Sequence, residues 1–107
     1  MNRLPLPVVA LALLSSGVLA ASPATPPAAP SRLGLCAACH GRDGIAVMPG
    51  APNLAGQRLD YLRDALQQYR DGRRDVAVMR AAVGPLGDAE LDALARWYAA
   101  QPARGAR

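Results

Sequence analysis

The sequence predicts an all-α domain, because signals for β-strands are nearly absent and apolar residues recur at helical spacing. After residue 20 the chain contains six β-branched residues, and none of them alternates with polar residues over the length of a strand. These residues are Thr25, Ile45, Val47, Val76, Val78 and Val83. In two other segments the apolar residues return every three or four positions, which places them on one face of a helix.

The first of these segments predicts a helix in the middle of the chain. Its apolar residues are spaced at i, i+3, i+7 and i+10: Leu59, Leu62, Leu66 and Tyr69. Gly72 follows where a helix C-terminus favours glycine. We therefore expect this helix to end just before Gly72.

The second segment predicts the last helix. It is expected to begin near Gly87, because Asp88 and Glu90 then lie in the first turn, where carboxylates interact favourably with the helix dipole. Its apolar face consists of Leu91, Leu94, Ala95 and Tyr98. Pro102 is expected to end the helical region.

Shorter helical segments are expected elsewhere. Asp75 is placed to cap a helical turn over residues 76–82, which residues 84–85 close. A short first helix is expected from about Ser31, followed by a long irregular loop over residues 41–56.

Residues 1–20 are predicted to be a secretory signal peptide. Arg3 supplies a positive start, residues 8–14 form an apolar core, and residues 18–20 offer small or modest-sized side chains near the cleavage site. The apolar stretch ends well short of the roughly 20 residues that a membrane-spanning helix needs. An uncleaved membrane anchor is the alternative, because the two prolines before residue 8 fit neither arrangement well.

The rest of the chain is long enough for one domain. Residues 21–30 are rich in Pro and Ala and predict an extended tether. The folded domain is expected over residues 31–101, and residues 102–107 form a short basic tail that we expect to be disordered. Export by the signal peptide would place this domain in the periplasm.

The exported part is short of large apolar side chains. Removing residues 1–20 leaves 87 of the 107 residues, with no Phe, one Trp and three Tyr. A core made of these side chains alone is marginal at this size. A bound apolar cofactor would complete it.

The charge is moderately basic, with a formal net charge of +4 for the whole chain and +3 after loss of Arg3. All twelve basic residues are arginines. This balance favours partners with acidic docking surfaces. Nucleic acid is the less favoured partner, because the arginines are interleaved with aspartates and form no stripe with aromatic residues.

The motif that carries chemistry is Cys36-Ala37-Ala38-Cys39-His40. Two thiols three positions apart span about one helical turn, so both can add to neighbouring vinyl groups on one edge of a porphyrin. The imidazole in the next position can reach the iron. The motif therefore predicts one covalently attached haem c, bonded to Cys36 and Cys39 and ligated by His40.

Three other interpretations of this motif compete. A thioredoxin-like redox pair requires a preceding strand, which the sequence does not predict. A structural zinc site requires a fourth ligand, either Asp43 or a distant residue. A plain disulfide suits an exported protein but leaves His40 unexplained.

The segment from Cys36 to Tyr98 resembles class I cytochrome c, in particular the small periplasmic monohaem cytochromes of bacterial respiratory chains. The run Cys-Ala-Ala-Cys-His-Gly-Arg-Asp-Gly is typical of that group. The run Pro-Asn-Leu-Ala-Gly-Gln over residues 52–57 and the spacing from Met79 to Leu86 are typical of it too. The resemblance implies helices wrapped around one haem, with the first and last helices crossing.

The second axial ligand of the iron is not fixed by the residues alone. His40 is the only His and the chain has no Lys, so the ligand is Met48, Met79, a small molecule or nothing once Met1 is removed. Met79 lies 39 residues after His40, far enough for the intervening helix to wrap around the ring. Met48 lies eight residues away, and roughly 27 Å of extended chain does not exclude it. The resemblance favours Met79, because the family keeps its ligand before the last helix and places Pro52 on the His side.

Several residues are expected to support the cofactor. The resemblance implies that the carbonyl of Pro52 accepts the second ring N–H of His40, which would orient the imidazole. Leu54 is expected to pack on the haem. Asn53, Gln57 and Arg58 are candidate partners of the haem propionates.

The aromatic residues are expected to serve packing. Trp97 and Tyr98 are assigned to the core or the haem edge, and Tyr61 and Tyr69 to helix packing. The resemblance also implies contact between a small residue of the first helix and an aromatic residue of the last, for which Gly34 with Trp97 or Tyr98 would serve.

The predicted function is electron transfer without catalysis. Filled axial positions leave substrates no place on the iron, and a thioether ligand favours ferrous iron. The leading hypothesis is a periplasmic carrier between redox proteins, which would meet the membrane only through a partner or an uncleaved anchor. The alternatives are an accessory cytochrome subunit of a dehydrogenase or oxidase complex, a ligand-binding haem protein, and a haem-free zinc or disulfide module.

Overall fold

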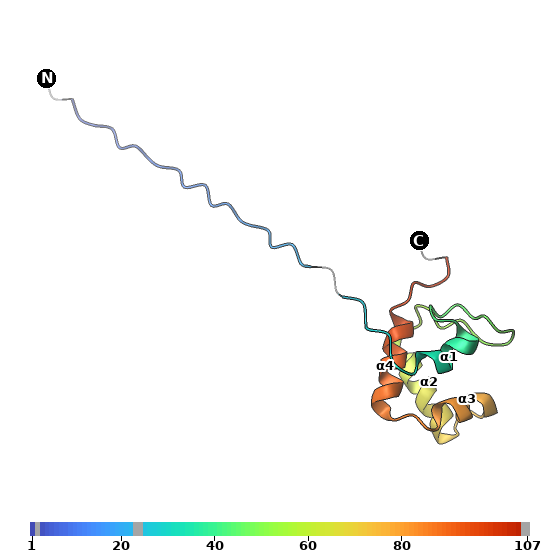
Figure 1. Ribbon diagram of the computed structural model, residues 1–107. Helices are drawn as coiled ribbons and strands as arrows, with labels where there is room; N and C mark the ends of the chain where they lie inside the picture. The colour runs from blue at the N-terminus through green and yellow to red at the C-terminus, as the bar shows by residue number, and fades with distance from the viewer. Residues whose placement is uncertain (2, 23–24, 106–107) are drawn as a thin grey trace.

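The computed structural model describes residue 1, residues 3–22 and residues 25–105. The remaining positions fall in the predicted signal peptide, tether and tail, and lie outside the described residues. Within the described ranges the chain forms α-helices and no strand, which confirms the all-α prediction (Figure 1). The helices are α1 (Leu33–His40), α2 (Leu59–Asp71), α3 (Ala77–Val83) and α4 (Asp88–Ala99).

The described residues before Ser31 run as an extended segment that leads away from the helices (Figure 1). Their large apolar side chains are exposed, including those of the stretch over residues 8–14. None of the helices in the described ranges combines the length and apolar character needed to cross a bilayer. The signal peptide over residues 1–20 and the tether over residues 21–30 stay predictions.

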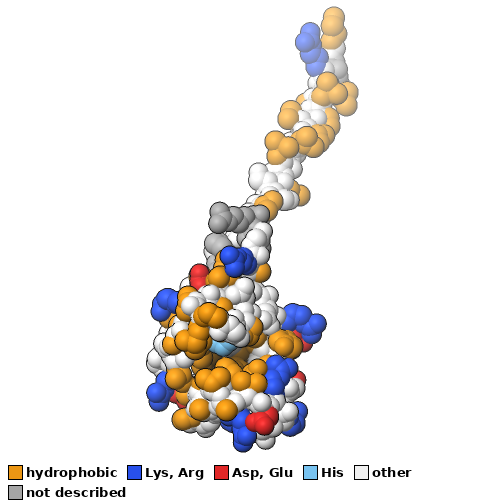
Figure 2. Space-filling view, turned by 90° about the vertical axis from the view of Figure 1, so that its right-hand side faces the viewer, with side chains coloured by type: hydrophobic (Ala, Val, Ile, Leu, Met, Phe, Trp, Pro, Cys, Tyr) orange, Lys and Arg blue, Asp and Glu red, His pale blue; other side chains and the backbone are white. Residues whose placement is uncertain are grey.

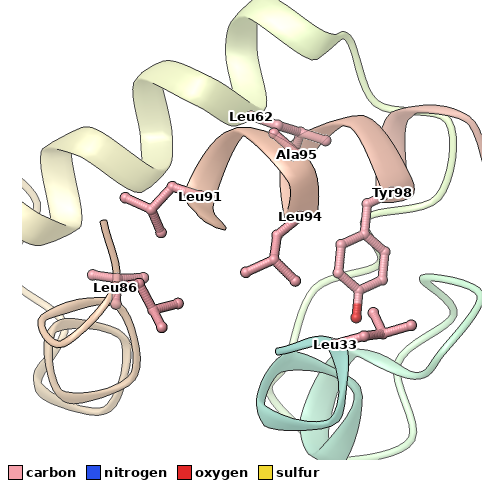
Figure 3. Close-up of a cluster of buried hydrophobic side chains, with 8 residues drawn as sticks. Leu33, Leu62, Leu86, Leu91, Leu94, Ala95 and Tyr98 are labelled. Atoms are coloured by element: carbon pink, nitrogen blue, oxygen red, sulfur yellow. The ribbon is translucent and has the colours of Figure 1, made fainter. Parts of the chain in front are cut away.

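Helices α2 and α4 form the main packed unit, and α3 packs against α2. The apolar face predicted for α4 is buried as expected, and Leu62 and Ala65 of α2 are buried with it. In Figure 3, Leu94 points from α4 into the space between α1 and α3. Leu94 is 2% exposed, and burying a leucine side chain contributes about 1.5–3 kcal/mol.

The ends of the long helices follow the sequence signals. Gly72 adopts a left-handed conformation after α2, with φ of 84° that residues bearing a Cβ rarely adopt. At the start of α4, Glu90 Oε2 accepts the backbone N–H of Gly87 at 3.0 Å. The prediction that Asp75 caps the short helix is wrong. Val76 occupies the cap position without a side-chain hydrogen bond, and Asp75 instead accepts from Arg80 at 3.2 Å.

Helix α1 begins two residues later than predicted and packs through the buried side chain of Leu33, with Cys36 and Ala37 partly buried against the core. Leu33 is 3% exposed and meets Tyr98 of α4 (Figure 3). The predicted contact of Gly34 with the last helix is wrong. Gly34 is exposed, and a Cβ added there would meet nothing within 4 Å, because the helix turns Leu33 inward in its place.

The loop over residues 41–56 closes on itself through backbone hydrogen bonds. The carbonyl of Gly44 accepts the N–H groups of Leu54 and Ala55 at 2.8 and 3.1 Å. Gly44 is buried at this closure. The closure brings the second half of the loop back to the end of α1, where the motif lies.

Ion pairs join the outer surfaces of α2 and α4. Arg63 and Arg96 both bind Asp92, and Arg70 binds Asp88. These pairs are partly exposed, so each contributes about 0–1 kcal/mol. These pairs also neutralise part of the positive charge of the arginines, so fewer arginines remain unpaired for contact with acidic partners.

Candidate functional site

A cleft of about 550 Å³ opens between α1 and α3 and is also lined by residues of α2 and α4. Figure 2 looks into this cleft, with the histidine at its base and hydrophobic side chains around its rim. The volume falls in the range of about 300–1,000 Å³ that cofactor sites occupy. Its wall is lined by all six residues predicted to bind the cofactor or its iron: Cys36, Cys39, His40, Pro52, Leu54 and Met79.

The motif occupies the last turn of α1. Cys36, Cys39 and His40 are at i, i+3 and i+4, so the helix brings all three to one face. His40 is 7% exposed. Burial raises the pKa of the Cys36 thiol above its ordinary value.

A hydrogen bond fixes the imidazole of His40. Its Nδ1 lies 2.8 Å from the carbonyl oxygen of Pro52. A carbonyl only accepts, so Nδ1 must carry the hydrogen, and the lone pair is left on Nε2. This arrangement sets the tautomer that a metal-binding histidine requires.

The two candidate methionines approach the cleft from different elements. Met79 belongs to α3, is half-buried and packs against the core cluster. Met48 lies in the loop and is 50% exposed, and its Sδ is 3.5 Å from Sγ of Cys39. Met48 is therefore beside the motif on α1, whereas Met79 reaches the cleft from another helix.

The three candidate propionate partners separate in the structure. Gln57 lines the cleft, but its amide donates to the carbonyl of Asn53 at 2.6 Å. Asn53 accepts from the N–H of Ala46 at 2.8 Å and braces the loop. Arg58 is exposed and pairs with Asp60, so the structure does not bring it to the cleft wall.

The aromatic residues of α4 tie this helix to the segment after the motif. The hydroxyl of Tyr98 donates to the carbonyl of Gly41 at 2.9 Å, and its ring lines the cleft. Burial raises the pKa of Tyr98, so the hydroxyl keeps its proton. The indole N–H of Trp97 donates to the carbonyl of Arg42 at 2.6 Å, outside the cleft lining.

Three residues that line the cleft were not predicted from the sequence to lie there. Tyr61 and Tyr69 line the cleft rather than serving helix packing alone, and the guanidinium of Arg74 lies over both rings. A signal for the tyrosines was present, because residues eight apart share a helix face. The position of Arg74 depends on the chain reversal after α2, and the sequence carries no simple signal for it.

The competing interpretations of the motif find no support. Within the described residues, no group of three or more His, Cys, Asp or Glu side chains is placed to hold a metal ion. Cys36 and Cys39 are not joined to each other by a disulfide. The cleft instead fits a haem, since it offers two thiols on one helical turn, an oriented imidazole and a largely apolar wall.

A family model described as cytochrome c oxidase, cbb3-type, subunit III matches residues 33–97. The chain belongs to this family of cytochromes c. Membership, together with a single attachment motif, means that the protein carries one covalently bound haem c and functions in electron transfer. The match begins at the first residue of α1 and ends within α4, so it spans the helices that line the cleft.

Individual relatives agree with this assignment. Cytochrome c-554(548) of Halomonas halodenitrificans is 38% identical over 73 residues, which cover 65% of this chain and 88% of that protein. The thiosulfate dehydrogenase electron acceptor of Thiomonas intermedia is 42% identical over 90 residues, which cover 82% of this chain and 42% of that protein. The solved cytochrome c4 of Acidithiobacillus ferrooxidans superposes with a TM-score of 0.56 at 31% identity, covering 61% of this chain and 37% of that one. The chain thus spans most of the first relative and less than half of the other two.

Proposed function

We propose that the protein is a periplasmic electron carrier whose haem is bonded to Cys36 and Cys39 and ligated by His40 and Met79. The observation that supports this most is the shared cleft. His40 on α1 and Met79 on α3 line the same cavity, and the hydrogen bond to Pro52 leaves Nε2 of His40 free for iron.

The residues of the cleft have separate tasks in this proposal. The haem supplies a one-electron couple when bound. The Pro52 carbonyl holds His40 in one tautomer, and the soft thioether of Met79 favours ferrous iron. Leu54, Leu94 and the other apolar lining residues exclude water, which also favours the less charged state.

Partners are proposed to dock at the mouth of the cleft. Six large apolar side chains remain exposed in the folded part, and five of them line the cleft: Leu35, Met48, Tyr61, Val76 and Val78, with Val47 beside them. Arginines surround this region in Figure 2. Acidic partner surfaces would complement them, although seven of the arginines are already paired with carboxylates.

Replacement of each methionine tests the proposal. Met79→Ala is expected to abolish the sulfur-to-iron charge-transfer band of the ferric protein, while Met48→Ala, the matched control, retains it. Retention of the band in Met79→Ala, or its loss in Met48→Ala, contradicts the ligand assignment.

Occupation of the sixth position of the iron has its own test. A filled sixth position is expected to prevent carbon monoxide from binding the ferrous wild-type protein at neutral pH. Rapid binding would instead favour a ligand-binding haem protein.

An accessory subunit is the second candidate function, and the Pro- and Ala-rich segment over residues 21–30 favours it as a tether to a complex. Purification at high salt separates the two. A carrier is expected to elute alone, whereas a subunit retains its dehydrogenase or oxidase.

A further inference from the structure

The guanidinium of Arg74 is held over two aromatic rings at the cleft wall. Its central carbon lies 5.3 Å from the ring centre of Tyr69 and 5.9 Å from that of Tyr61. All three residues line the cleft. A cation over the face of a tyrosine is attracted by about 0.5–1 kcal/mol at exposed sites, so two rings restrain this side chain.

The chain reversal after α2 places Arg74 in this position. Gly72 turns the backbone with its positive φ, and the N–H of Arg74 then donates to the carbonyl of Gln68 at 3.0 Å. The segment therefore folds back beside the helix face that carries Tyr61 and Tyr69. The backbone turn and the two rings together therefore determine where the guanidinium of Arg74 lies.

Arg74 lacks the carboxylate partner that most arginines of this protein have. Its neighbour Arg73 binds Asp71 at 2.8 Å. Among the described residues, no carboxylate lies within ion-pair distance of Arg74. A positive charge without a carboxylate partner thus borders a largely apolar cleft, within reach of an anionic group of a bound cofactor.

We propose that Arg74 binds a propionate carboxylate of the haem and raises the reduction potential of the iron. A guanidinium has five N–H donors, more than its contacts with the two tyrosines use, so donors remain for a carboxylate. A nearby positive charge stabilises ferrous over ferric haem, because the ferrous state carries one positive charge less. This inference rests on the proposed function. It assigns to Arg74 the contact with a propionate for which Asn53 and Arg58 were candidates.

Measurement of the reduction potential of the haem-loaded protein tests this role. Arg74→Gln is expected to lower the ferrous-to-ferric ratio at a fixed ambient potential by about tenfold, which equals about 59 mV for one electron. Arg73→Gln is the matched control, since it removes the same charge one residue away from Arg74, and its ferrous-to-ferric ratio is expected to change less than twofold. Arg74→Lys keeps the charge and is expected to restore part of the loss.

The remaining outcomes overturn the proposal. Equal shifts in Arg73→Gln and Arg74→Gln would show a general charge effect. An unchanged potential in Arg74→Gln with slower electron exchange with a redox partner would assign Arg74 to docking. The charge-transfer band is recorded in every variant, so that failure of the Met79 ligation is recognised separately from failure of the Arg74 role.

Discussion

The hydroxyl of Tyr98 donates a hydrogen bond to the carbonyl of Gly41, the residue that follows the histidine of the haem motif. This contact joins the last helix to the end of the first across 57 residues of sequence. Both residues are buried, so water does not readily replace the bond if it is lost.

Tyr98→Phe is therefore expected to reduce the free energy of unfolding of the haem-loaded protein by about 1–2 kcal/mol. The ring is retained, so the packing of Leu33 against it is unchanged. Chemical denaturation measures the effect. Tyr61→Phe is the control, because Tyr61 is 48% exposed, and a change equal to that of Tyr98→Phe would contradict the prediction.

Gly41 and Gly34 are expected to respond in opposite directions to alanine. Gly41 has a φ of 76° and a ψ of 156°, and a Cβ there would lie 2.1 Å from the carbonyl oxygen of Ile45. Gly41→Ala is expected to cost more than about 3 kcal/mol. Gly34→Ala is expected to stabilise α1 by about 0.5–1 kcal/mol, because its Cβ meets nothing. Destabilisation by Gly34→Ala would instead support the helix contact that the structure lacks.

Acid is expected to weaken the start of α4. Hydrogen bonds from Arg70 and Arg63 lower the pKa values of Asp88 and Asp92, and the Gly87 N–H lowers that of Glu90. A folded pKa below the unfolded value contributes stability that is present above about pH 4 and is lost as the pH falls through the lowered values. The melting temperature is expected to fall below pH 4, and less steeply in Asp92→Asn. A melting temperature that stays constant from pH 5 to pH 3 would contradict this.

Covalent attachment is expected to depend on both thiols of the motif. The double variant Cys36→Ala/Cys39→Ala should give no haem stain on a denaturing gel, because neither thioether can form. Met79→Ala should keep the full stain, since an axial bond does not survive denaturation. Staining of the double variant would place the attachment elsewhere.

Local signals explain most of what the sequence predicted. The faces of α2 and α4, the glycine after α2 and the carboxylates that begin α4 depend on spacing over a few residues, and the structure contains them. The six predicted cofactor residues also share one cleft, because the motif and the family-like runs carry strong local information.

The failures concern features that depend on the packing of distant segments. Which side of α1 faces α4 is decided by burial of Leu33, and no local sequence signal favours Leu33 over Gly34 for this contact. Asp75 had an arginine within reach that competed with capping. Arg74 could not be placed because its neighbours on α2 become neighbours only after the chain reverses.

The helices differ in how firmly the rest of the polypeptide holds them in the fold. The packed unit is α2 with α4 and α3, whereas α1 is held mainly through Leu33 and the bonds around Tyr98. The helix that bears both thiols is thus the one that the polypeptide secures least. Thioether bonds from Cys36 and Cys39 to a haem in the cleft, which α3 and α4 also line, would therefore tie this helix to the rest of the domain.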